Sequence, residues 1–224
     1  MKMQLAEIAQ ALNTSCEGDA ETVITSVAFD SRKISQGALF IPIKGERDGH
    51  DFVGSAIEAG ASATLWEAGN PNKPEGIAVL EVADTLKAMQ DLARYYLQKV
   101  NPTVVSITGS NGKTTTKDMV AAVLGEKYRV LKTEGNLNNE IGVPMTLLRL
   151  SGEHEIAVLE LGMNHAGEID YLSALVEPDV VLMTNIGDSH IEHFGSREKI
   201  LEAKSEIFHH VKSGAFVVIN GDIP

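Results

Sequence analysis

The stretch that most constrains the fold is residues 103–116, which read Thr-Val-Val-Ser-Ile-Thr-Gly-Ser-Asn-Gly-Lys-Thr-Thr-Thr. A β-rich apolar run leads into a turn with two glycines. A helical stretch follows, with Met119, Val120, Val123 and Leu124 on one face. Strand, glycine turn and helix start are together typical of a phosphate-binding loop. The glycines let backbone N–H groups turn inward, and the helix start adds partial positive charge.

Lys113 and Thr114 give this turn its predicted chemistry. Lys113 can reach a β- or γ-phosphate, and the Thr114 hydroxyl can bind Mg²⁺. The strict pattern G-x-x-x-x-G-K-[ST] is not met, because Ile107 occupies its first glycine position. An ordinary strand–helix turn with a surface lysine is the alternative, which the Gly-Lys-Thr between strand and helix disfavours. We therefore predict an ATP site that comprises Gly109, Ser110, Asn111, Gly112, Lys113, Thr114 and Thr115.

Strand and helix patterns alternate along the second half of the chain. Apolar strand candidates occur at 103–107, 129–133, 156–161, 180–186 and 215–220, and helix candidates occur at 113–124, just after Pro144, and at 167–176 and 197–211. This alternation predicts an α/β protein with a mostly parallel sheet and helices on both faces.

The first 83 residues predict a smaller α/β unit. It has a helix at 4–12 and strands at 23–29, 38–43, 63–66 and 77–82. We expect two domains, residues 1–83 and 84–224. The sequence stops just after an apolar strand, so we expect the second domain to be incomplete.

Charge and cysteine content exclude several classes of protein. The net charge of −12 provides no general basic surface for nucleic acid. Cys16 is the one cysteine, so no internal disulfide can form, which fits a reducing compartment. No apolar run approaches the roughly 20 residues of a membrane span, and none follows Lys2 as in a signal peptide. We expect a cytoplasmic monomer without a nucleic-acid partner or a membrane span.

Further polar clusters follow the predicted strands, where ligands of parallel sheets bind. Glu160 ends an apolar strand, and its carboxylate could hold Mg²⁺ or cap the next helix. Asn138 and Asn139 offer amide donors and acceptors, although a solvated Asn/Gly loop has the same composition. His190 and His193 suggest zinc, but two histidines in a glycine loop with one cysteine in the chain make a weak zinc set.

Lys204 lies in an unusual setting for a lysine. Helical spacing places it on one face with Ile200, Leu201, Ile207 and Phe208. A lysine on such a face is costly unless it is paired, modified, or extended so that its ammonium reaches water. These alternatives stay open on the sequence alone.

In combination these motifs resemble the Mur ligase family. The stretch 108–116 resembles the ATP loop of Mur ligases and folylpolyglutamate synthetases, which also lacks the first Walker glycine. Asp30-Ser31-Arg32, with 37–40 and 44–52, resembles the family's uridine-nucleotide domain. The stretches 135–144 and 160–165 resemble the branch that joins D-alanyl-D-alanine to UDP-N-acetylmuramoyl-tripeptide. The resemblance runs along essentially the whole chain.

The resemblance implies an ATP-dependent amide ligase of peptidoglycan precursor synthesis, a step in cell wall biogenesis that cell shape and cell division depend on. A substrate carboxylate would form an acyl phosphate with ATP, and the amine of D-alanyl-D-alanine would displace phosphate. It implies catalytic roles for Lys113, Glu160, His190 and Lys204. Thr114, Glu160, His190 and Lys204 would bind Mg²⁺ ions, and Lys204 would be carbamylated. Ser31, Arg32, Asn138 and Asn139 would contact the substrate.

Several alternatives remain beside this interpretation. The nearest is the sister ligase that adds a diamino acid to the UDP-muramoyl-dipeptide. A non-catalytic nucleotide-binding module could keep the same fold, but intact Lys113, Glu160, His190 and Lys204 argue against a loss of chemistry. A folate-type ligase, or a P-loop kinase or GTPase, would not need the uridine-nucleotide module of residues 1–83.

We expect this chain alone to be inactive or very weakly active, because full-length family members carry a further domain for the incoming amino compound. The measurement is phosphate release with ATP, UDP-N-acetylmuramoyl-tripeptide and D-alanyl-D-alanine. Turnover at an ordinary kcat of about 1–10³ s⁻¹ would contradict this expectation.

Overall fold

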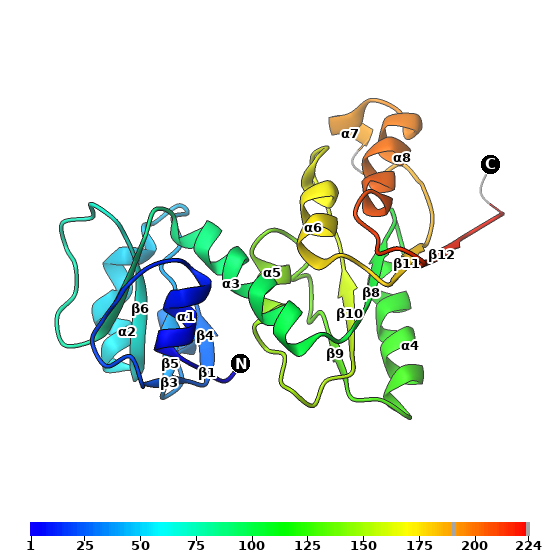
Figure 1. Cartoon of the computed structure of the whole chain (residues 1–224). Helices are drawn as coiled ribbons and strands as arrows, with labels where there is room; N and C mark the ends of the chain where they lie inside the picture. Colours follow the sequence, from blue (N-terminus) through cyan, green and yellow to red (C-terminus); the bar gives the residue numbers. More distant parts are fainter. Residues whose placement is uncertain (190, 223–224) are drawn as a thin grey trace. The chain divides into compact units, whose positions relative to one another are not determined.

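The computed structural model describes residues 1–189 and 191–222, and Figure 1 shows its helices and strands. These residues group into two compact units. The first comprises Met1–Gln98 with Leu147–Ser151, and the second comprises Lys99–Thr146 with Gly152–Pro224. Among the described residues, we find no helix with the length and apolar character that a membrane crossing requires.

The predicted domain boundary between residues 83 and 84 lies just before helix α3 (Thr85–Val100), most of which groups with the first unit. The boundary stays a prediction, because compactness alone does not show which segments fold by themselves.

The first unit contains a five-stranded sheet in the order β2-β7-β6-β5-β4. Its pairs are parallel except for β2 with β7, and β1 and β3 form a separate antiparallel pair. The elements are β1 (Met3–Gln4), α1 (Leu5–Ala11), β2 (Cys16–Glu17), β3 (Val23–Ile24), β4 (Ser26–Ala28), η1 (Ser31–Lys33), β5 (Ala38–Phe40), η2 (Gly49–Phe52), α2 (Val53–Glu58), β6 (Ala61–Glu67), β7 (Ala78–Val82) and α3.

The second unit contains a five-stranded sheet in the order β12-β11-β8-β10-β9, in which every pair is parallel. Its elements are β8 (Thr103–Thr108), α4 (Lys113–Gly125), β9 (Val130–Lys132), α5 (Gly142–Leu147), β10 (Ile156–Glu160), α6 (Glu168–Val176), β11 (Val180–Met183), α7 (Ile191–Phe194), α8 (Arg197–Ser205), η3 (Glu206–Phe208) and β12 (Phe216–Ile219). The predicted α/β class, with a parallel sheet flanked by helices, is confirmed.

Chain direction places helices on both faces of this sheet. The connection from β8 to β9 carries α4 toward one edge, whereas the connection from β10 to β11 carries α6 toward the other edge. Since such crossovers are right-handed, α4 and α6 cover opposite faces. The central strands are accordingly apolar, and all five residues of β10 are buried.

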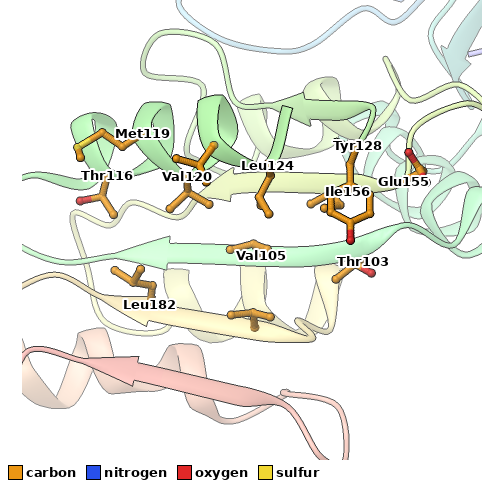
Figure 2. Close-up of a pocket in the computed structure, with 12 residues that line it drawn as sticks. Thr103, Val105, Thr116, Met119, Val120, Leu124, Tyr128, Glu155, Ile156 and Leu182 are labelled. Carbon is orange, nitrogen blue, oxygen red and sulfur yellow. The ribbon is translucent and has the colours of Figure 1, made fainter. Parts of the chain in front are cut away.

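One face of the sheet is covered only in part. A cavity of about 920 Å³ lies between α4 and the strands, lined by Val120 and Leu124 from the helix and by Val105 and Leu182 from the sheet (Figure 2). It is the largest of the cavities described here, yet it contains none of the predicted site residues.

Several element ends differ from the sequence predictions. The predicted strand 180–186 ends at Met183, because the following residues bond to the glycine turn instead. The predicted helix 197–211 ends at Ser205 and continues as a short 3₁₀ turn. Helix α5 begins at Gly142, before Pro144. The first turn of a helix tolerates proline, because an N–H group at that position would have no partner within the helix and proline lacks one. Helix α7 was not expected.

Two valine truncations test this assignment of core and exposed face. Val158→Ala in β10 should lower the free energy of unfolding by about 2 kcal/mol, because it removes two buried methyl groups. Val123→Ala on the exposed face of α4, where Val123 is 72% exposed, should change it by less than about 0.5 kcal/mol. Urea unfolding followed by circular dichroism would measure both, and equal losses would contradict the assignment.

Candidate functional site

The candidate site lies at the carboxyl edge of the second unit's sheet. Register pairs Glu160 of β10 with Ile107 of β8, and Met183 of β11 with Thr108. The segments that follow these three strands therefore emerge at one edge, where parallel sheets bind ligands.

The turn between β8 and α4 depends on two glycines. Gly109 and Gly112 have φ angles of +146° and +78°, which L side chains rarely adopt. A Cβ on Gly109 would also lie 1.9 Å from Thr184 Oγ1. Position 109 therefore needs glycine for two reasons: its positive φ angle, and the close approach of Thr184, which directly follows β11.

The segment after β11 holds the turn in place. Asn185 accepts hydrogen bonds from the backbone N–H of Ser110 and of Asn111, through its carbonyl and side-chain oxygens, each at 2.9 Å. Thr184 Oγ1 donates to the Asn111 carbonyl at 2.6 Å. Gly187 N donates to Ser110 Oγ at 2.9 Å.

These bonds limit which donors a phosphate could use. The N–H groups of Ser110 and Asn111 are already bonded within the protein. Those of Lys113, Thr114 and Thr115, in the first turn of α4, have no acceptor among the described residues. An anion at this turn would therefore meet the helix N-terminus.

Lys113 lies against the same turn. Its Nζ donates to the Gly109 carbonyl at 2.9 Å. Burial lowers the pKa of Lys113, and the nearby carboxylate of Glu160 opposes this by favouring the charged ammonium.

Glu160 is joined to the turn by a pair of hydrogen bonds. Thr114 Oγ1 donates to Glu160 Oε2 at 2.8 Å, and Asn138 Nδ2 donates to Oε1 at 2.9 Å. The side chain of Glu160 is nearly buried, with 2% of the residue exposed. Gly162 permits this arrangement, because a Cβ there would lie 2.8 Å from Asn138 Cγ.

The two predicted substrate asparagines have different environments. Asn138 contacts Glu160, as above, whereas Asn139 Oδ1 accepts hydrogen bonds from the backbone N–H of Ile141 and Gly142 near the start of α5. Ser31 and Arg32 lie in the first unit, at a cavity of about 720 Å³. His190 lies outside the described residues.

Lys204 is buried on α8, with 1% exposed, among Ile200, Ala203 and Ile207. Leu201, which the helical spacing placed on the same face, is exposed instead. Burial, and to a smaller extent the cation of Lys113, together lower the pKa of Lys204 to about 8. We find no hydrogen-bond or ion-pair partner for its ammonium among the described residues.

The residues present fit a magnesium–nucleotide site better than a zinc site. The described residues contain no cluster of three or more His, Cys, Asp or Glu side chains suited to a metal. Mg²⁺ is usually held by one or two carboxylates together with substrate phosphates, and Thr114 with Glu160 offers such a pair of oxygens.

The motif analysis missed two residues that contact the glycine turn from the segment after β11. Thr184 and Asn185 belong to the stretch that contains His190 and His193, and they bind the glycine turn through hydrogen bonds. The sequence did offer one signal for them, since a polar pair stands directly after the apolar run that forms β11, the neighbour of β8.

Comparison with known proteins gives two family matches. Residues 107–224 match the Mur ligase middle domain, and residues 23–97 match the Mur ligase family catalytic domain. A curated relative from Bacillus subtilis, named UDP-N-acetylmuramoyl-tripeptide–D-alanyl-D-alanine ligase, is 56% identical over 91% of this chain and 45% of its own length.

Solved structures agree with these matches. A crystal structure of MurF from Acinetobacter baumannii has a TM-score of 0.90 at 38% identity, covering 100% of this chain and 49% of its own. A MurF ligase from Thermotoga maritima in complex with ADP has a TM-score of 0.79 at 38% identity, covering 88% of this chain and 46% of its own. The chain thus spans about half the length of these relatives.

Removal of the buried lysine should stabilise the protein. Lys204 has a pKa of about 8 when folded and 10.5 when unfolded. The unfolded state therefore binds more protons between these values, and wild-type stability rises with pH across that window. Lys204→Met should raise the free energy of unfolding by roughly 1–3 kcal/mol at neutral pH. This gain should shrink as the pH rises toward 10.5.

Urea unfolding in bicarbonate-free buffer would measure this gain, with hydrogen exchange in α8 to locate it. Lys199→Met, an exposed lysine on the same helix, is the matched control and should have little effect. A Lys204→Met variant less stable than wild type at neutral pH would contradict the prediction.

Proposed function

This chain belongs to the Mur ligase family, and on that basis we propose that it supplies the two nucleotide-binding parts of an ATP-dependent amide ligase. The proposed reaction joins D-alanyl-D-alanine to UDP-N-acetylmuramoyl-tripeptide. The names of relatives at 38–56% identity support this choice over the sister ligase that adds a diamino acid. The observation that carries the proposal is the set of Lys113, Thr114 and Glu160 at one glycine turn.

The first step is phosphoryl transfer. The terminal carboxylate of the tripeptide attacks the γ-phosphorus of ATP, the bond to the bridging oxygen breaks, and ADP leaves with the electron pair. Such transfer depends on positioning and charge neutralisation. The ammonium of Lys113 supplies positive charge, and the N–H groups at the start of α4 orient the phosphates.

The second step forms the amide. The amine of D-alanyl-D-alanine attacks the acyl carbon, phosphate leaves, and the amine loses a proton. Asn138 would contribute to the reaction through Glu160, because its side-chain amide holds the Glu160 carboxylate beside Thr114.

Thr114 and Glu160 would hold Mg²⁺, which would supply positive charge to offset that of the phosphates. The 2.8 Å separation of their oxygens supports this assignment. His190 is proposed as a further ligand from the family resemblance alone.

Lys204 is proposed to be carbamylated. A pKa of about 8 leaves part of the amine neutral at physiological pH, and a neutral amine can add CO₂ and lose a proton. The product exchanges a buried cation beside Lys113 for an anion, which would remove the repulsion between the two lysines.

The nucleotide part of the UDP precursor is proposed to bind in the first unit's cavity, beside Ser31 and Arg32. The adenosine part of ATP is proposed to extend from the turn toward a cavity of about 620 Å³ lined by Asn185, Arg197 and Ile219. We further propose that the protein acts in the cytoplasm, a reducing compartment that the single Cys16 supports. We also propose that it is a monomer.

Calorimetric titration of the chain with ADP and Mg²⁺, and separately with UDP-N-acetylmuramoyl-tripeptide, tests the proposal. We expect both to bind. Lys113→Ala should weaken ADP binding by about tenfold or more, because a charge-assisted phosphate contact is lost, and should leave the tripeptide nucleotide unaffected. Lys127→Ala, an exposed lysine of the same unit, is the control. A folded chain that binds neither compound would refute the proposal.

A further inference from the structure

The first unit's cavity contains three charged residues, and two of them neutralise each other. Arg32 donates from Nε and Nη2 to the two carboxylate oxygens of Asp30, each at 2.9 Å. These hydrogen bonds lower the pKa of Asp30 to about 2, so the carboxylate stays ionised. An anion that enters the cavity meets this pair as a nearly neutral unit.

Arg47 lines the same cavity and is not neutralised. Its backbone carbonyl accepts a hydrogen bond from Gly45 N at 3.1 Å, but among the described residues its guanidinium has neither a hydrogen-bond partner nor an ion-pair partner. Lys44, the other cation of its loop, is paired with Glu67 at 2.5 Å. The net positive charge of the cavity lining therefore comes from Arg47.

The loop that carries Arg47 is held on both sides. Asp48 Oδ1 accepts from the backbone N–H of His50 at 3.0 Å and lies 2.6 Å from its Nδ1. His50 is only 4% exposed and packs edge-on against Trp66. Gly49 N donates to the Ile43 carbonyl at 3.1 Å, and a Cβ on Gly49 would lie 2.5 Å from Ile43 N.

A fixed loop reduces the ordering cost of binding. The backbone at Arg47 is set before a ligand arrives, so only its side chain must become ordered. Ser31 and Ser55 add hydroxyl groups to the same lining, and Phe52 adds an aromatic ring. Hydroxyls, an aromatic ring and one uncompensated guanidinium suit a ligand with a planar base and a doubly charged phosphate group.

We propose that Arg47 binds the diphosphate of the nucleotide-linked substrate in this cavity. The inference rests on the proposed function, because it takes the cavity to be the site of the uridine nucleotide. Arg32 then acts as a positioning residue, because its guanidinium holds the carboxylate of Asp30 through two hydrogen bonds. Arg47 presents its free fork to phosphate oxygens, a geometry that guanidinium matches through paired hydrogen bonds.

The test is titration of the whole chain with UDP and with uridine, which lacks the diphosphate. Excess ADP is present throughout, so that the phosphate turn of the second unit is occupied. Arg47→Ala should weaken UDP binding by about tenfold or more and uridine binding by less than about twofold. Arg47→Lys should recover part of the loss. Because the side chain of Arg47 is exposed and unpaired, the variants should unfold at the wild-type temperature.

Lys33→Ala is the matched control for long-range charge. Lys33 acts electrostatically on Asp30 but does not line the cavity, so its removal should weaken UDP binding by less than about threefold. Equal losses from Lys33→Ala and Arg47→Ala, or equal losses of UDP and uridine in Arg47→Ala, would overturn the role of Arg47.

The two proposals fail in different ways. Wild-type chain that binds neither UDP nor UDP-N-acetylmuramoyl-tripeptide would refute the nucleotide site in the first unit, and the role of Arg47 with it. Wild-type chain and Arg47→Ala that bind UDP equally well would refute the role of Arg47 alone and leave the site standing.

Discussion

Parallel pairing of β8 with both β10 and β11 is the constraint on which the second unit's site depends. Strand direction and register bring the segments after Thr108, Glu160 and Met183 to one edge of the sheet. Residues separated by 46 positions, Thr114 and Glu160, then lie within hydrogen-bond distance. No local preference of either residue could produce that contact, because it follows from the pairing of two strands on either side of a crossover helix.

The glycine turn shows how such a site is made rigid before a ligand arrives. Asn185 occupies the N–H groups of Ser110 and Asn111, which leaves those at the start of α4 as donors for an anion. A turn whose donors are fixed in advance has little reorganisation to undergo during a reaction. The first unit uses the same principle, since the contact of Asp48 with His50 fixes the loop that carries Arg47.

Charge burial links the two lysines of the second unit. Burial lowers the pKa of both Lys113 and Lys204, and the cation of Lys113 also contributes to lowering the pKa of Lys204. A stable fold would not need two cations so placed, because each carries a desolvation cost. Their retention is understandable if anionic groups, such as nucleotide phosphates and a carbamate, accompany them in the working protein.

The sequence by itself determined the fold class and the position of the glycine turn between β8 and α4. Apolar runs of five or six residues alternate with helical periodicity, and two glycines beside Lys113 and Thr114 have few structural uses other than a turn that faces an anion. These are local signals, carried by residues adjacent in the chain. Family motifs extended them to Ser31, Arg32, Glu160 and Lys204, whose proposed roles stay predictions.

Tertiary structure alone decided which contacts those residues make. It showed that Asn138 contacts Glu160, that Asn185 holds the turn, that Leu201 is exposed while Lys204 is buried, and that Arg32 is neutralised by Asp30 whereas Arg47 is not. Most of these facts depend on strand register or on the packing of one element against another. Sequence patterns describe which face of an element a residue occupies, but the partner across that face is set only when distant segments come together.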